Sequence, residues 1–302
     1  MTQELQAELH QGVLVRFFGG FYVAADADGQ EYTLRCPKKI PPSAPVAPVG
    51  DAVRFTPGQG EEEGWLVEIL PRKTECIRPP VANVTLLLVS ICPSPEPDLL
   101  LVDRLLARAK KQGMKTALIV GKCDLDGGKL LAQMQEEYRG ADCPVLGVSA
   151  RNKEGLDSVR ALMRGADCCC LAGQSGVGKS TLLNALLDLQ LETGEISEKI
   201  QRGKNTTRYA QLLIHDGIHV LDTAGFSLLE TEKGMEPEEL QELYPEFQPY
   251  IGQCRFQPCL HDREPGCAVT QAVQAGKIDG NRVARYRELL ADVRLAWKNR
   301  YQ

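Results

Sequence analysis

No apolar run in the sequence approaches the roughly 20 residues that a membrane-spanning helix needs. The longest candidate, residues 84–91, has the length of a buried strand. Residues 1–4 lack the basic and apolar pattern of a secretory signal, and no internal repeat is visible. These absences argue against a membrane protein and lead us to expect a cytoplasmic location.

Net positive charge is also missing, because 35 Lys and Arg residues face 40 Asp and Glu residues. The net charge of −5 argues against a protein that coats nucleic acid indiscriminately, although local basic patches stay open. In a cytoplasmic protein the 11 cysteines should be thiols or metal ligands rather than disulfides. The length of 302 residues allows two or three domains.

The stretch that organises the chain is residues 168–183, which read as a buried strand, a glycine loop and a helix start. Its loop fits the pattern G-x-x-x-x-G-K-[ST], in which backbone N–H groups surround phosphate oxygens and the helix start faces the same anion. We expect Lys179 to reach the β- and γ-phosphates and Ser180 to bind Mg²⁺. The expected nucleotide contacts are Gly173, Gln174, Ser175, Gly176, Val177, Gly178, Lys179, Ser180 and Thr181.

Two further loops indicate that the base is guanine. Asp124, in Gly121-Lys122-Cys123-Asp124, follows a predicted strand and can accept both N1–H and N2–H₂ of guanine, a pair of donors that adenine lacks. Lys122 can lay its aliphatic stem on the base. Ser149-Ala150 follows another predicted strand and can present a backbone N–H to the guanine O6. A kinase or ATPase is therefore disfavoured.

The other residues that a phosphoryl-transfer site needs come after the phosphate loop in the sequence. Asp222 fits a water-mediated contact to Mg²⁺, and the Gly225 N–H fits the γ-phosphate. One hydroxyl of Thr206 or Thr207 is expected to complete the Mg²⁺ coordination together with Ser180. Catalysis is thus assigned to Lys179, Thr206, Thr207 and Gly225.

The order of these motifs is unusual, because both base-reading loops precede the phosphate loop. Most GTPases have the reverse order, so the sequence predicts a circularly permuted GTPase. Residues 222–226 then lead directly into the C-terminal part of the chain. We hypothesise that nucleotide state moves that part as an output.

A second group of residues has the composition of a metal-binding site. Cys254, Cys259, His261 and Cys267 lie within fourteen residues and form a Cys₃His set, which is typical of structural zinc. The spacing is not a paired C-x-x-C, so three buried thiols beside an unrelated histidine is the alternative. Four protein ligands leave no open position, which disfavours a catalytic zinc.

Three domains are predicted from the pattern of elements. Residues 1–72 contain five short strands at 12–17, 21–25, 32–36, 51–56 and 64–70, separated by turn signals, which suggest an OB-type barrel; a generic β-domain is the alternative. After a linker at 71–80, residues 73–230 alternate strands and helices as in a mostly parallel α/β sheet. Residues 231–302 read as a mostly helical zinc-binding domain.

The last helix of this C-terminal domain has an apolar stripe and a basic face. Val283, Tyr286, Leu290, Val293 and Trp297 recur at spacings of three and four. We interpret the opposite face as solvated. The alternative is that it binds the phosphate backbone of a nucleic acid. Its residues are Arg282, Arg285, Arg287, Arg294, Lys298 and Arg300.

A five-stranded barrel, a permuted GTPase and a Cys₃His module in this order resemble the bacterial ribosome small subunit-dependent GTPase A family. The resemblance covers nearly the whole chain and includes Gly19-Gly20-Phe21-Tyr22, residues 78–84, the phosphate loop and residues 264–269. It implies a GTPase that binds the small ribosomal subunit late in maturation, is stimulated by it and leaves on hydrolysis. The barrel and the zinc module would contact the rRNA, and we expect a monomer.

The chain departs from this family at three positions. Gly121 stands where the family usually has Asn, which removes an amide contact and should lower nucleotide affinity. Asn205 stands where the family usually has a His that is suspected of positioning water, so the resemblance adds Asn205 to the catalytic residues. Ala224 stands where Pro is frequent. Phe226 is the usual hydrophobic residue at a position where many GTPases carry Gln. We therefore expect slow intrinsic hydrolysis, because Asn205 cannot act as a base at neutral pH.

The leading interpretation is an enzyme that hydrolyses GTP during small-subunit assembly. Its rival is a nucleotide-gated RNA-binding module whose hydrolysis is incidental, a possibility to which Gly121 and Asn205 give weight. Cations are available on the barrel for RNA, and binding through them should weaken steeply with salt. They are Arg16, Arg35, Lys38, Lys39, Arg54, Arg72 and Lys73.

Overall fold

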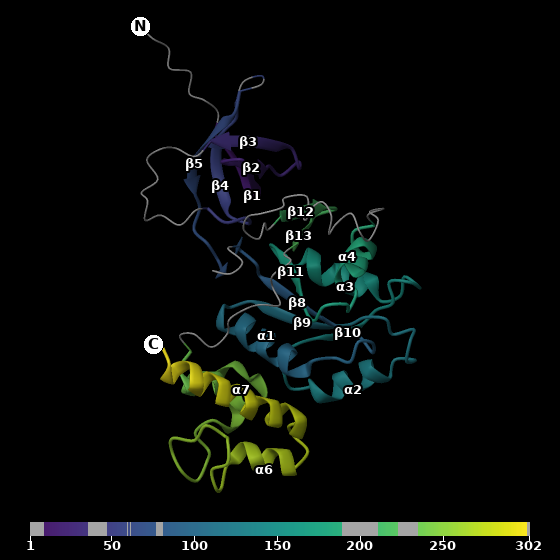
Figure 1. Cartoon of the computed structure of the whole chain (residues 1–302), viewed down its shortest axis with the longest axis vertical. Helices are drawn as coiled ribbons and strands as arrows, with labels where there is room; N and C mark the ends of the chain where they lie inside the picture. Colours follow the sequence, from purple (N-terminus) through teal and green to yellow (C-terminus); the bar gives the residue numbers. More distant parts are fainter. Residues whose placement is uncertain are drawn as a thin grey trace. The chain divides into compact units, whose positions relative to one another are not determined.

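The computed structural model describes residues 9–35, 47–58, 60, 62–76, 81–188, 211–222 and 235–300 (Figure 1). The chain divides into two compact units. One comprises residues 1–86, 162–171 and 194–226, and the other comprises 87–161, 172–193 and 227–302. Among the described helices, none is long and apolar enough to cross a membrane. The three-domain division from sequence stays a prediction.

Five strands near the N-terminus form a closed barrel in the order β1-β2-β3-β5-β4, which confirms the predicted barrel. All pairs are antiparallel except β3 and β5. Alternate side chains point inward, and a cluster that includes Leu14, Leu34, Phe55 and Leu66 fills the interior. The strands are β1 (His10–Phe18), β2 (Phe21–Ala25), β3 (Glu31–Arg35), β4 (Ala52–Thr56) and β5 (Gly64–Ile69).

The predicted linker at residues 71–80 contains regular structure, which corrects the sequence interpretation. β6 (Glu75–Cys76) pairs antiparallel with β7 (Val81–Ala82). Arg72 holds this segment to the barrel, because its guanidinium donates to the fully buried carboxylate of Asp51 at 2.7 and 2.9 Å.

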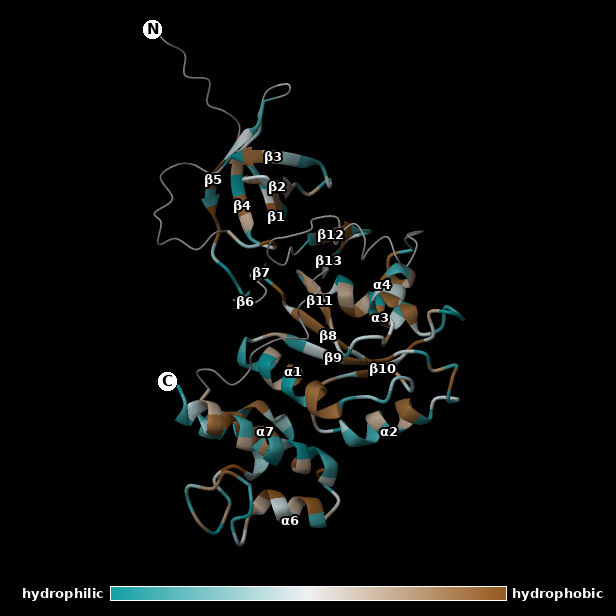
Figure 2. Cartoon of the chain, viewed as in Figure 1, coloured by the Kyte–Doolittle hydropathy of each residue, from teal (hydrophilic) through white to brown (hydrophobic). Residues whose placement is uncertain are grey.

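The α/β part contains a six-stranded sheet in the order β10-β9-β8-β11-β13-β12. The pairs β10–β9 and β11–β13 are parallel, and β12 pairs antiparallel with β13, so the mostly parallel prediction is confirmed. Every residue of β8 is buried, and all of them except Ser90 are apolar, in keeping with the brown colour of this strand in Figure 2. The strands are β8 (Leu86–Ile91), β9 (Lys115–Val120), β10 (Val145–Gly147), β11 (Cys169–Ala172), β12 (Gln211–His215) and β13 (Ile218–Asp222).

Four helices connect these strands, in keeping with the predicted alternation of strands and helices. α1 begins at Leu99 because the Asp98 carboxylate accepts the N–H of Leu101 at 2.9 Å. Both the base-reading and the phosphate loops follow the carboxyl ends of parallel strands, which is where ligands of such sheets bind. The helices are α1 (Leu99–Lys111), α2 (Lys129–Glu137), α3 (Leu156–Arg164) and α4 (Lys179–Leu186).

The C-terminal part packs η2 (Pro237–Leu243), η3 (Pro245–Tyr250), α6 (Ala268–Gln274) and α7 (Gly280–Lys298) around one apolar cluster. Both short helices of this part are 3₁₀ helices, and a proline occupies the first position of each, where its missing backbone N–H costs no intrahelical hydrogen bond. Four members of the α7 stripe, Val283, Tyr286, Leu290 and Val293, are buried as predicted, whereas Trp297 is half-buried.

The opposite face of α7 is not fully solvated, which corrects the sequence interpretation. Arg282 is only 3% exposed, and its guanidinium lies between the rings of Tyr138 and Tyr244, at 4.6 and 4.7 Å from their centroids. It forms ion pairs with Asp103 of α1 and, at 2.6 Å, with Glu246. These buried charges fix α7 against α1.

Arg285 belongs to the same network. Its Nε donates to the Asp103 carboxylate at 2.6 Å, and its guanidinium pairs with Glu137 of α2. Burial would lower the pKa of Arg282, but the carboxylates of Asp103 and Glu246 more than offset it and hold that pKa well above its ordinary value. Arg294, by contrast, pairs with Asp262 near the surface.

Candidate nucleotide site and metal centre

The phosphate loop has the strained backbone that its glycines permit. Gly173 has φ +134°, and a Cβ there would lie 2.2 Å from the Ser90 carbonyl oxygen, so no other residue fits. Gly178 has φ +93° and caps the start of α4. The Lys179 ammonium lies inside this loop and donates to the carbonyls of Gly173 and Gln174 at 2.8 and 2.9 Å. Burial lowers the pKa of Lys179, as expected for a cation withdrawn from water.

A cavity of about 250 Å³ lies beside this loop and brings the two base-reading loops together. Of the residues predicted from sequence, Lys122, Asp124, Ala150, Val177, Gly178 and Thr181 line it. The sequence analysis missed Ser90, Leu125, Val148, Arg151 and Leu182, which also line it. Leu125 and Arg151 directly follow the predicted motifs, so extending each motif by one residue would have found them.

Asp124 and the Ser149 loop are held together by hydrogen bonds. The Ser149 hydroxyl donates to Asp124 Oδ1 at 2.7 Å, and the Cys123 N–H donates to the Val148 carbonyl at 3.2 Å. The Ser149 N–H is already donated to the Glu154 carbonyl at 3.1 Å. The Ala150 N–H is therefore the better candidate donor to a base oxygen, whereas the Ser149 hydroxyl holds the Asp124 carboxylate.

Lys122 connects the base loop to the phosphate loop. Its Nζ donates to the Ser94 carbonyl at 2.8 Å and to the Gly176 carbonyl at 3.3 Å. The backbone at Lys122 has φ +55°, which turns the side chain along the cavity. A Cβ added at Gly121 would make only ordinary van der Waals contacts, at 3.5 Å from the Ile91 oxygen and 4.0 Å from the Val177 oxygen.

Four predicted catalytic residues, Asn205, Thr206, Thr207 and Gly225, lie outside the described residues, as do Ala224 and Phe226, which the sequence compares with other GTPases. Asp222 ends β13, but its side chain is not described either. The roles of these residues in Mg²⁺ binding and hydrolysis stay predictions.

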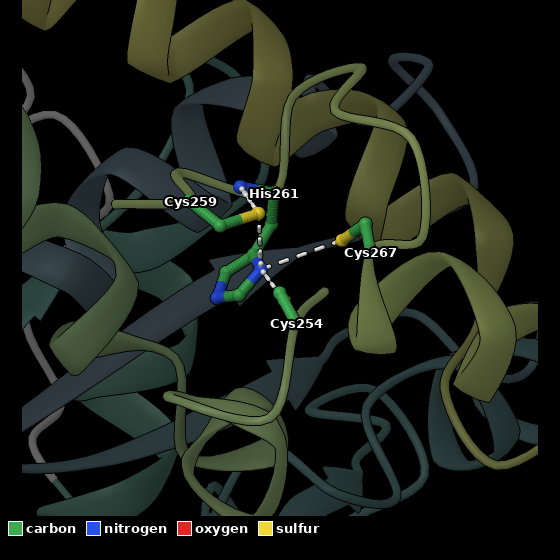
Figure 3. Close-up of side chains that lie close together, drawn as sticks. All are labelled: Cys254, Cys259, His261 and Cys267. Atoms are coloured by element: carbon green, nitrogen blue, oxygen red, sulfur yellow. Dashed lines mark hydrogen bonds between the residues drawn. The ribbon is translucent and has the colours of Figure 1, made fainter. Parts of the chain in front are cut away.

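The four metal-like residues do come together, in the C-terminal part (Figure 3). Their ligand atoms all lie within 4.8 Å of one another, and all four residues are buried. His261 Nδ1 lies 3.6 Å from the sulfurs of Cys254 and Cys259 and 3.4 Å from that of Cys267. A tetrahedral zinc with usual bond lengths holds sulfur and nitrogen donors about 3.6 Å apart. The geometry therefore fits a zinc ion at the centre of the cluster.

The surroundings of the cluster suit anionic thiolates and a neutral imidazole. The N–H of Ala268 points at the Cys254 sulfur at 3.2 Å, and the N–H of His261 points at the Cys259 sulfur at 3.4 Å. Burial lowers the pKa of His261, which keeps the Nδ1 lone pair available. α7 fixes the loop from outside, because the Tyr286 hydroxyl donates to the Leu260 carbonyl at 2.8 Å.

The sequence is similar to those of a known GTPase family. The model of the RsgA GTPase family matches residues 69–232. Small ribosomal subunit biogenesis GTPase RsgA of Geobacillus thermodenitrificans is 40% identical, covering 94% of this chain and 97% of its own. The protein of the same name from Moorella thermoacetica is also 40% identical, with the same coverage.

Solved structures agree with these relatives. The crystal structure of YjeQ from Thermotoga maritima aligns with a TM-score of 0.81 and 31% identity over 95% of this chain and 99% of that one. YloQ, described as a circularly permuted GTPase, aligns with a TM-score of 0.78 and 26% identity over 97% and 98%. These similarities cover both base-reading loops, the phosphate loop and the metal cluster.

Proposed function

The chain belongs to the RsgA GTPase family and is a GTP hydrolase, and from this premise we propose that it binds the small ribosomal subunit and assists its late maturation. The strongest support is the 40% identity to relatives named small ribosomal subunit biogenesis GTPase over 94% of the chain. That span includes the barrel and the metal cluster as well as the GTPase sheet. A factor with this task would work in the cytoplasm, and we propose that it acts as a monomer.

The nucleotide site supports GTP as the substrate. The free oxygen of Asp124 would accept guanine N–H groups, Ala150 would donate to O6, and the phosphate-loop N–H groups with Lys179 would hold the phosphates. Ser180, Asp222 and one of Thr206 and Thr207 would hold Mg²⁺, which neutralises charge on the transferred phosphoryl group. Asn205 would orient water without taking its proton.

The metal cluster would hold a structural zinc. Cys254, Cys259, Cys267 and His261 provide four donors, so no position is left for substrate. Zinc would fasten the loop before α6 to the rest of the C-terminal part and so shape its surface.

We place the rRNA contact on this C-terminal surface. Residues 251–300 contain nine Lys and Arg against five Asp and Glu. Arg255 stacks on the ring of Phe256, which is 51% exposed, at 5.2 Å. Within the described residues neither Arg255 nor the exposed Arg263 forms an ion pair, so both charges are available to phosphates.

The test is GTP turnover by the purified protein with and without isolated small ribosomal subunits. Strong stimulation by the small subunit, with none from the large subunit, is the expected result. GTP-dependent binding without stimulation would favour a switch-like binder with incidental hydrolysis. Absence of both stimulation and binding would refute the proposed partner and leave the nucleotide and metal sites standing.

A further inference from the structure

The strand β8, in the middle of the sheet, contains one polar residue, Ser90. The other residues of Leu86–Ile91 are apolar, and every residue of the strand is buried. Ser90 itself is only 2% exposed. A buried hydroxyl without a hydrogen bond costs free energy, because it gives up its contacts with water and gains none in return.

No protein group satisfies the Ser90 hydroxyl in the part of the chain that the structure describes. None of the described residues donates to this hydroxyl or accepts from it. Two other buried hydroxyls, those of Thr74 and Ser149, do find partners, because they donate to the Val84 carbonyl and to the Asp124 carboxylate at 2.7 Å each. An unpartnered buried hydroxyl that borders a cavity indicates a contact with a ligand or with ordered water.

Ser90 lies between the base-reading loop and the phosphate loop. The next residue of β8, Ile91, accepts the Gly121 N–H at 2.8 Å. On the other side, a Cβ added at Gly173 would lie 2.2 Å from the Ser90 carbonyl oxygen. Because β8 lies between β9 and β11 (Figure 1), its side chains face the layers that cover the sheet. Ser90 lines the nucleotide cavity together with Leu182 of α4.

Among the described side chains that line this cavity, Ser90 is the one buried hydrogen-bond donor. The other side-chain donors are Lys122, Arg151 and Thr181, and each of them is partly or largely exposed. Lys122 already donates to two carbonyls. Ser90 therefore provides the donor at the buried end of the cavity.

We propose that the Ser90 hydroxyl donates a hydrogen bond to N7 of the bound guanine, directly or through one ordered water. Guanine has two acceptors on one edge, O6 and N7. With N1–H and N2–H₂ on Asp124 and O6 on the Ala150 N–H, N7 is the acceptor of that edge that still lacks a donor. Asp124 is exposed, and N7 lies on the side of the base away from N1 and N2, so N7 faces the buried end of the cavity.

The inference rests on the guanine contacts proposed for Asp124 and Ala150. It adds to them a residue that belongs to neither the base-reading motifs nor the phosphate loop. Gly121 brings no side chain to this part of the cavity, so the polar group there comes from the neighbouring strand β8. Ser90 thereby becomes a residue that determines which purines the site accepts.

The test compares GDP with 7-deaza-GDP, in which a C–H group replaces N7 and the other polar groups of the base are kept. Isothermal titration calorimetry of the full chain measures both affinities. The parent should bind 7-deaza-GDP about two- to twelvefold more weakly than GDP, which is the range of one hydrogen bond. Ser90→Ala should weaken GDP by the same factor and leave 7-deaza-GDP unchanged, so that the discrimination disappears.

Thr116→Val is the matched control. It removes a hydroxyl from a buried residue of the neighbouring strand β9, and Thr116 does not line the cavity. Both affinities should stay as they are in the parent.

Three outcomes overturn the inference. Equal binding of GDP and 7-deaza-GDP by the parent shows that N7 receives no hydrogen bond. Discrimination that persists in Ser90→Ala shows that another group donates to N7. An equal loss for both nucleotides in Ser90→Ala shows that the hydroxyl supports the pocket and does not contact N7.

ADP as a third ligand separates these failures from a failure of the proposed GTP site. If ADP binds as tightly as GDP, the guanine contacts of Asp124 and Ala150 are refuted, and with them the orientation that turns N7 toward Ser90. If GDP is preferred over ADP while 7-deaza-GDP equals GDP, the role of Ser90 alone is refuted. None of these measurements needs ribosomes, so they leave the proposed small-subunit partner to its own test.

Discussion

Replacing Gly121 with Asn should tighten nucleotide binding. Gly121 is not among the residues with positive φ, and a Cβ added there meets only ordinary contacts, at 3.5 Å from the Ile91 oxygen. The two nearest atoms are carbonyl oxygens, of Ile91 and of Val177 in the phosphate loop. An asparagine amide at this position can therefore donate to the Val177 carbonyl. It would add a second hydrogen bond to the phosphate loop beside the one from Lys122 to the Gly176 carbonyl.

The expected gain in affinity is at most that of one hydrogen bond, because a bond that also forms without nucleotide stabilises the free and the bound protein equally. A net contribution of about 0.5–1.5 kcal/mol corresponds to about two- to twelvefold tighter binding of GDP. The matched control is Gly121→Ala, which adds the Cβ without the amide. It should raise the free energy of unfolding by about 0.4–1 kcal/mol through loss of freedom in the unfolded chain, and leave GDP affinity unchanged.

Equilibrium titration of a fluorescent GDP analogue with the parent and both variants measures the effect. Thermal unfolding without nucleotide separates stability from affinity. If Gly121→Asn and Gly121→Ala bind GDP equally, the amide makes no useful contact and the reasoning from the two carbonyl oxygens is refuted.

Three further changes test other parts of the structure. Arg282→Met should lower the free energy of unfolding by about 3–5 kcal/mol, because it leaves the buried Glu246 carboxylate without its cation and removes one of the two cations of Asp103, whereas Arg294→Met at the surface should cost less than about 1 kcal/mol. Chemical denaturation compares the two. Asn205→His should speed single-turnover hydrolysis, and an unchanged rate with and without ribosomes would remove Asn205 from the mechanism. Cys259→Ser should lose zinc by elemental analysis, while Cys143→Ser retains it.

The elements and motif loops were predictable because their signals are local. Five strands with turn residues between them and a glycine loop before Lys179 all depend on residues that are neighbours in sequence. The zinc-like cluster was predictable for the same reason, since its four members lie within fourteen residues. The correct ligand atom of His261 was not, because either ring nitrogen could have faced the sulfurs.

The charges of α7 were not predictable because their partners are remote in sequence. Arg282 is 179 residues from Asp103, and a helix pattern alone cannot distinguish an arginine that meets a buried carboxylate from one that meets water. The same limit applies to the barrel. Arg16 and Arg54 count as free cations in the sequence, whereas the strand register places an acid beside each. Local composition therefore misjudged both the buried and the available charge.

The position of the buried ion pairs also bears on how nucleotide state reaches the C-terminal part. Chain order suggested a direct route through residues 222–226, but Asp103 adds a connection through α1. The N-terminal cap of that helix, Asp98, donates its N–H to the Gln174 side chain in the phosphate loop at 3.2 Å.

Moving α7 against α1 would separate Arg282 and Arg285 from their carboxylates in buried surroundings, which costs several kcal/mol. We therefore expect α1 and α7 to keep their spacing between the GDP and GTP forms, so that any movement of the metal cluster carries α1 with it. Distances between spin labels at Lys111 and Glu288 test this expectation, because both lie at exposed positions on these helices. A nucleotide-dependent change in that distance would contradict this expectation. It would indicate that nucleotide state moves the C-terminal part through residues 222–226 without α1.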